Sequence, residues 1–178
     1  MTPQRLVVAI ATLLVGLSAG FFFTYEASVT LALGEVGDVT YVETFQAVNE
    51  TVRNPAFGIV FFGSIPAIVL AIVLTWTDAS PRRRALLIVA LASYLVGIVV
   101  TGTGNVPLND QLAASTSLTA EIAAQARREF EADWNRLNLL RSLAIGVSFV
   151  ALVAAGTFTP GANRNRNDRR SIGETASS

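Results

Sequence analysis

Four long apolar stretches constrain this chain more than any other feature of its 178 residues. They lie at about 6–33, 55–76, 82–103 and 139–159. Each is long enough to cross a membrane, since a spanning helix needs about 20 apolar residues at a rise of about 1.5 Å each. Only 15% of the residues are charged, whereas soluble domains carry about a quarter. The sequence therefore predicts an all-α fold, an integral membrane four-helix bundle.

The distribution of arginine predicts how the spans are oriented. All 13 basic residues are Arg and 13 residues are acidic, so the net charge is zero. Eight arginines fall on one predicted side, namely Arg5, Arg82, Arg83, Arg84, Arg164, Arg166, Arg169 and Arg170. Because basic residues concentrate in cytoplasmic segments, we expect both termini to be cytoplasmic at the cell membrane.

The domain organisation follows from the same pattern. Residues 1–160 are expected to form the transmembrane domain with an outer cap, and the polar residues 161–178 a disordered cytoplasmic tail. The alternative for the first stretch is a signal peptide, but its apolar run continues past Ser18 and is too long for one.

The residue types missing from the chain exclude several classes of site. Cys and His are both absent, which excludes disulfides, thiol nucleophiles, histidine bases and the usual zinc, copper and haem ligand sets. We therefore expect no metal and no cofactor. Zero net charge and short Arg clusters argue against nucleic-acid binding.

Gly16 and Gly20 have the spacing of close helix contacts, which would lie either within the bundle or in a homo-oligomer.

Two amphipathic helices are predicted on the extracytoplasmic side. Residues 40–52 carry an apolar stripe made of Tyr41, Phe45, Val48 and Val52. Residues from about 120 onward carry another, made of Ile122, Ala126, Phe130, Trp134, Leu137 and Leu140. Side chains at such spacing share one helix face. The second helix is expected to continue into the fourth span, either as a straight rod or with a kink near Asn138.

Polar side chains from different spans are predicted to meet at the outer membrane boundary. Glu26, the one carboxylate within a span, lies about 30 Å along the first helix. Asn105 and Arg141 come at matching heights, and these three are the candidate catalytic residues. The candidate substrate-binding residues are Gln46, Asn49, Asn109, Trp134 and Tyr25. An ordinary headgroup interface and a structural Glu26–Arg141 clasp remain open as alternatives to a ligand site.

Several short motifs in a fixed order give the chain a resemblance to a known family. They are Phe45-Gln46 with Asn49, Asn54-Pro55-Ala56-Phe57, Asn105-Val106-Pro107-Leu108-Asn109, and Trp134-Asn135 with Arg141. In the order and spacing of these motifs, up to Gly156, the chain resembles the anthrone oxygenase-like family of small four-span membrane proteins, most of unknown function. Its fungal members act in polyketide pathways, where dioxygen oxidises an anthrone to an anthraquinone.

The resemblance implies a cofactor-independent oxygenase acting on a planar, apolar, enolisable substrate at the outer membrane face. Such chemistry needs a base, donors for the enolate oxygen and an apolar slot. Glu26 is the candidate base, and the candidate donors are Asn105, Asn109, Trp134 and Arg141. The candidate walls are Phe21, Phe22, Phe23, Tyr25 and Trp134. The alternative is a non-catalytic membrane protein that binds a lipid, a hydrophobic ligand or a partner subunit.

Overall fold

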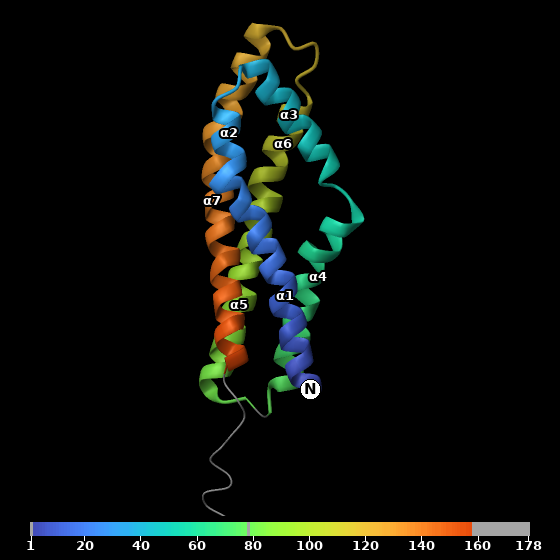
Figure 1. Cartoon of the computed structure of the whole chain (residues 1–178), viewed down its shortest axis with the longest axis vertical. Coiled ribbons are helices and arrows are strands. Elements are labelled where there is room, and N and C mark those ends of the chain that lie inside the picture. The colour runs from blue at the N-terminus through green and yellow to red at the C-terminus, as the bar shows by residue number, and fades with distance from the viewer. Residues whose placement is uncertain (1, 78, 158–178) are drawn as a thin grey trace, which may run out of the picture.

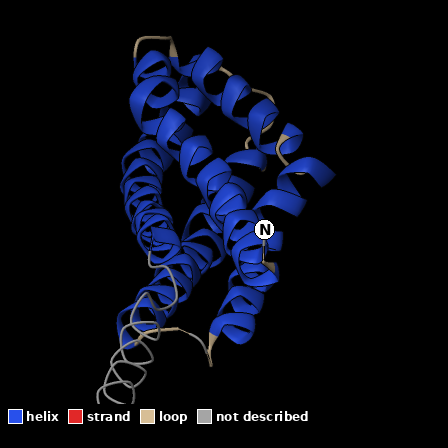
Figure 2. Cartoon of the chain, turned by 60° about the horizontal axis from the view of Figure 1, so that its bottom comes forward, coloured by secondary structure: helices blue, strands red, loops and turns tan. Residues whose placement is uncertain are grey.

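The computed structural model describes residues 2–77 and 79–157, so the predicted tail 161–178 lies outside the described residues. The described chain is helical, with short connections (Figure 2). Its elements are α1 (Pro3–Thr24), η1 (Tyr25–Val29), α2 (Thr30–Gly34), α3 (Asp38–Thr51), α4 (Pro55–Thr75), α5 (Pro81–Val100), η2 (Thr101–Asn105), α6 (Val106–Ala113) and α7 (Ala120–Thr157). Because η1 and η2 are π-helical turns within longer helices, these elements form four long rods and the separate helix α3.

The four rods are long and apolar enough to cross a membrane, which confirms the predicted all-α four-helix bundle. They are Pro3–Gly34, Pro55–Thr75, Pro81–Ala113 and Ala120–Thr157. α5 packs along α7, and α1 packs against both α4 and α7. The N-terminus, the α4–α5 connection and the end of α7 lie at one end of the bundle (Figure 1). α3 lies at the other, here called the cap end. Which end faces the cytoplasm stays a prediction.

Local sequence signals fix where three of the rods begin. Thr2, Asn54 and Ser80 each accept a hydrogen bond from the backbone N–H three residues further on. A proline follows each of them at the first helical position, where no backbone N–H is needed. These caps satisfy backbone donors that the helix itself leaves unpaired.

The third rod continues to Ala113, beyond the predicted end near residue 103. Gly102, Gly104 and Pro107 would each disfavour a helix interior. Instead, the π-helical turn η2 contains both Gly102 and Gly104. Pro107 lies in the first turn of α6, a position that proline tolerates. The longer rod carries residues 106–113 into the cap end.

The last helix, α7, is one unbroken element of 38 residues, so the predicted second cap helix continues into the fourth span. Its apolar stripe differs from the predicted one, because Ile122 and Leu140 are 41% and 47% exposed. Asn138 and Arg141 face the interior instead, with 0% and 5% exposure. A polar side chain facing lipid would be costly, whereas a leucine is not, so the polar residues occupy the inner face.

The cap helix α3 packs on α7 through aromatic rings. Tyr41 and Phe45 are each 1% exposed. The Phe45 ring centroid lies 4.9 Å from those of both Phe130 and Trp134. Tyr41 and Phe45 of the predicted stripe are therefore buried against the half of α7 nearer the cap end, whereas Val48 and Val52 are half-buried.

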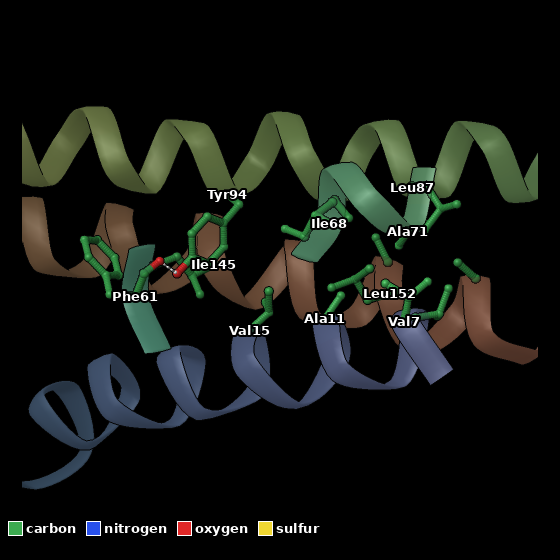
Figure 3. Close-up of a cluster of buried hydrophobic side chains, with 14 of the residues drawn as sticks. Val7, Ala11, Val15, Phe61, Ile68, Ala71, Leu87, Tyr94, Ile145 and Leu152 are labelled. Carbon is green, nitrogen blue, oxygen red and sulfur yellow. Dashed lines mark hydrogen bonds between the residues drawn. The ribbon is translucent and has the colours of Figure 1, made fainter. Parts of the chain in front are cut away.

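A buried tyrosine links three rods in the apolar core (Figure 3). The Tyr94 hydroxyl of α5 donates to the Phe61 carbonyl of α4 at 2.7 Å. The same hydroxyl lies 3.1 Å from Ser18 Oγ of α1. Gly97, one turn further along α5, has no side chain to keep α5 away from α7.

We expect Gly97→Ala to destabilise the bundle by about 1–3 kcal/mol through overpacking. A methyl group at this position would lie 2.7 Å from Ile145 Cγ1 of α7. Gly63→Ala is the matched control, because a methyl group there meets nothing within 4 Å. Thermal unfolding of both variants in detergent measures the difference. Equal unfolding temperatures would contradict this view of the α5–α7 contact.

A second comparison tests the hydrogen bonds of Tyr94. Tyr94→Phe should lower the free energy of unfolding by about 1–2 kcal/mol, because the Phe61 carbonyl and Ser18 lose their partner. Tyr41→Phe should be neutral or stabilising, because the buried Tyr41 hydroxyl has no hydrogen-bond partner. Denaturant titrations of the two variants measure the free energy of unfolding. A larger loss of this free energy in Tyr41→Phe than in Tyr94→Phe would refute the prediction.

Candidate functional site

A cavity of about 320 Å³ lies among the rods in the half of the bundle nearer the cap end. Its aromatic walls are Phe21, Phe22, Tyr25, Phe57, Phe61, Phe62 and Trp134. Its polar wall residues are Asn49, Arg53, Asn54, Thr101, Asn109 and Arg141. Small-ligand sites occupy roughly 300–1,000 Å³ and combine apolar walls with a few polar groups. The cavity therefore has the size and lining of a site for a small aromatic molecule.

Both π-helical turns begin at the wall of this cavity. η1 starts at Tyr25 and η2 starts at Thr101, and both residues line the cavity. Such turns are rare and occur frequently at functional sites. The glycines at 102 and 104 were the only visible hint of η2 in the sequence, and we find no comparable signal for η1.

Arg141 is the charged group buried deepest in the cavity wall, with 5% exposure. One Nη donates to Asn138 Oδ1, and the other lies 3.5 Å from Thr101 Oγ1. The guanidinium carbon is 4.1 Å from the ring centroid of Phe22 and 5.7 Å from that of Trp134. The Nε atom is buried without a hydrogen-bond partner. The wall thus holds a cationic donor that lacks an acceptor.

Glu26 is connected to Arg141 only through Asn138. Its carboxylate accepts a hydrogen bond from Asn138 Nδ2, and Glu26 is not among the residues that line the cavity. Within the described ranges, the salt bridges at 4.0 Å or less involve Arg53 and Arg127 but not Arg141. The structure therefore has no direct Glu26–Arg141 clasp in its described part, and an amide separates the two charges.

Two other predicted residues lie outside the cavity lining. Asn105 is 0% exposed, and its Nδ2 donates to the Trp134 carbonyl at 3.4 Å, while its Oδ1 has no partner. Gln46 donates to the carbonyls of Leu112 and Ser115 at 2.8 and 3.0 Å. Gln46 therefore holds the end of α6 against α3.

Five predicted residues do line one cavity, namely Tyr25, Asn49, Asn109, Trp134 and Arg141. Trp134 Nε1 donates to Asn109 Oδ1 at 2.8 Å, which fixes the plane of the indole. The Tyr25 and Trp134 ring centroids are 5.5 Å apart. Asn49 Nδ2 is buried without a partner, so it is a second donor that lacks an acceptor. The roles of these residues in binding or catalysis stay predictions.

Some site residues were missed or misplaced by the sequence analysis. Asn138, Thr101 and Phe57 were not singled out for the site, although Asn138 lies three residues before Arg141 and shares its helix face. Phe23, an expected wall residue, is 64% exposed and is not part of the lining. Consecutive helical residues point about 100° apart, so Phe21, Phe22 and Phe23 do not all face one cavity.

An open groove of about 820 Å³ adjoins the cavity between α1, α3 and α4. Its apolar surface includes Leu17, Val48 and Val60. Phe21, Tyr25, Val52, Asn54 and Phe57 line both hollows. The groove therefore leads from the bundle surface to the wall of the cavity.

The cap adds one electrostatic feature above the cavity. Burial raises the pKa of Tyr41 above its usual value, and the nearby carboxylate of Glu131 raises it further. The Arg127 guanidinium, 4.4 Å from the Tyr41 ring centroid, acts in the opposite direction. The Tyr41 hydroxyl is therefore neutral at physiological pH.

Over residues 2–77 and 79–157, no group of three or more Asp and Glu side chains is placed to hold a metal ion.

A family model described as anthrone oxygenase matches residues 55–151, which is more than half of the chain. The chain belongs to the anthrone oxygenase family. Comparisons with curated proteins and with solved structures give no match. The family name denotes an oxidoreductase, and the four apolar rods fit a small membrane protein.

The matched region covers only part of the site. It runs from α4 into α7 and contains Asn109, Trp134 and Arg141. Tyr25, Glu26 and Asn49 lie before it, although the motifs noted in the sequence begin earlier in the chain.

Proposed function

We propose that this protein is a cofactor-independent oxygenase that converts a planar, apolar, enolisable aromatic substrate to a quinone with dioxygen. The observation that carries the proposal is Arg141, a buried cation that lines an aromatic cavity. Family membership supports the same reaction class.

The reaction requires an anionic intermediate. An anthrone-type substrate loses a proton from its ring CH₂ group and becomes an enolate. The enolate carbon gives electrons to dioxygen and forms a carbon–oxygen bond, and the resulting peroxide takes up a proton. Loss of the second C–H proton with cleavage of the O–O bond gives a carbonyl and water. The sum is one substrate and one dioxygen giving one quinone and one water.

Three features of the cavity suit this chemistry. Its rings, such as Phe57 and Trp134, offer flat faces for a polycyclic substrate. Arg141 and Asn49 line the cavity and carry N–H donors, which would bind the enolate oxygen. Donors that are already oriented in a water-poor site stabilise developing negative charge strongly. Lowering the energy of the enolate is therefore the main task of this chain in the proposed mechanism.

The route of the first proton follows from the lining. Among the described residues, no carboxylate lines the cavity. Glu26, the base candidate from the sequence, is held by Asn138 outside that lining. We therefore propose that Arg141 makes the substrate acidic enough to release its proton to water. Glu26 would then take no proton from the substrate, and the hydrogen bond from Asn138 would hold it outside the cavity.

Arg141→Met should lower kcat/KM for oxygen uptake with anthrone by about 100-fold or more, since a donor for the enolate oxygen is lost. Arg136→Met is the matched control, because Arg136 is an exposed arginine of the same helix. Protein-free micelles correct for spontaneous oxidation of anthrone. The unfolding temperature of each variant verifies its fold. Equal oxygen uptake by the two variants would refute the proposal.

Glu26→Gln should leave kcat/KM for oxygen uptake within about threefold and leave the shape of the pH–rate profile unchanged, because a carboxylate outside the cavity does not accept the substrate proton. The measurement is kcat/KM in detergent between about pH 4 and about pH 9, a range that includes the ordinary pKa of a glutamate, about 4.3. Loss of the acidic limb together with a fall of about 100-fold would instead make Glu26 the base, as the sequence predicted.

A second candidate function is binding of a hydrophobic ligand without catalysis. The open apolar groove favours it, because its walls at Leu17 and Val60 suit an acyl chain. Saturable binding of anthraquinone with oxygen uptake no faster than in protein-free micelles would support this candidate. Oxygen uptake that depends on Arg141 would exclude it.

A further inference from the structure

Asn138 is a fully buried polar residue to which neither the family match nor the motifs give a role. It is 0% exposed and lies on the inner face of α7, three residues before Arg141. Its Oδ1 accepts from the Arg141 guanidinium, and its Nδ2 donates to the Glu26 carboxylate on η1. One amide therefore connects the cation and the anion of this buried region.

The direction of the amide follows from its partners. A guanidinium can only donate hydrogen bonds and an ionised carboxylate can only accept them. The negative end of the Asn138 dipole thus faces Arg141, and its positive end faces Glu26. This orientation stabilises both charges while keeping them apart. In a direct contact, the Glu26 carboxylate would itself accept the hydrogen bonds of the Arg141 guanidinium. Fewer of these donors would then remain for a ligand.

The separation leaves the two charges in different surroundings. Arg141 lines the cavity, whereas Glu26 does not. The other ionisable groups of the cavity wall are Tyr25 on η1 and Arg53, which pairs with Asp110 at 2.8 Å through half-exposed side chains. Within the described part of the chain, the cavity wall thus contains cationic and neutral groups, whereas Glu43 lines the adjoining groove. Arg141 is the buried charge of the wall, so a bound anion would be stabilised there.

We infer that Asn138 is a positioning residue that keeps Arg141 and Glu26 as a separated ion pair, so that the cavity binds planar aromatic ligands as their anions, enolates or phenolates. The inference deepens the proposed function, on whose cavity it rests, and it concerns binding and not turnover. It excludes neutral lipids and simple hydrocarbons as the preferred occupants.

A pair of probes tests the inference by absorbance. 2-Hydroxyanthraquinone changes colour when its phenol ionises, and 2-methoxyanthraquinone has the same ring system but does not ionise. We expect the native protein in detergent to increase the acid ionisation constant of the bound hydroxy probe about tenfold or more relative to protein-free micelles, a shift of about one pKa unit. No increase in the native protein would overturn the inference.

Two variants should move this ionisation constant in opposite directions. Asn138→Asp places a carboxylate directly against Arg141, so the increase should disappear. Glu26→Gln removes the distant anion, so the increase should persist or grow. Ala132→Asp, which adds the same charge on an exposed face of α7, is the control and should behave as the native protein. A native-like constant in Asn138→Asp, or a lost increase in Glu26→Gln, would overturn the inference.

Binding of the methoxy probe distinguishes a change of charge in the cavity from unfolding of the variant. It should bind Asn138→Asp within about twofold of the native affinity, since its contacts are apolar. If Asn138→Asp fails to bind it, the Glu26→Gln arm decides alone, because that substitution changes charge and not size. If the protein binds the phenolate preferentially but consumes no oxygen, this inference is supported and the proposed oxygenase function is refuted.

Discussion

A charged arginine inside an apolar bundle is the constraint on which the site depends. Isolated charge is expensive away from water, so Arg141 needs polar partners from the surrounding rods. It finds Asn138 on its own helix, Thr101 on η2 and the ring face of Phe22 on α1. Because these partners come from three rods, the burial of one side chain ties together the helices that enclose the cavity.

The bundle distributes polarity as a membrane requires. Large apolar side chains such as Leu13, Val73 and Val150 are 62%, 63% and 65% exposed. In a membrane these side chains contact lipid, so the hydrophobic effect does not drive them into the core. The interior holds an apolar core, with Ile68 and Ile145 among its residues, together with polar groups such as Ser18 and Asn138. A cavity with aromatic walls and a few donors is consistent with this arrangement.

Most of the fold could be predicted because it depends on local and additive signals. The hydropathy of the spans and the caps at Thr2, Asn54 and Ser80 are short-range properties of the chain. The extension of the third rod beyond residue 103 escaped prediction because the π-helical turn η2 contains Gly102 and Gly104, and glycine ordinarily disfavours a helix interior. The inward stripe of α7 was misjudged because the apolar face of a helix in lipid need not face the core.

The sequence by itself determined the four rods, the amphipathic cap helix and the residues available for chemistry, since periodicity and composition encode them. The tertiary structure decided that Arg141 faces a cavity, that Glu26 does not, and that Asn138 stands between them. These facts depend on how the rods that contain η1 and η2 pack against α7. That packing arises from contacts between distant segments, which no local pattern in the chain records.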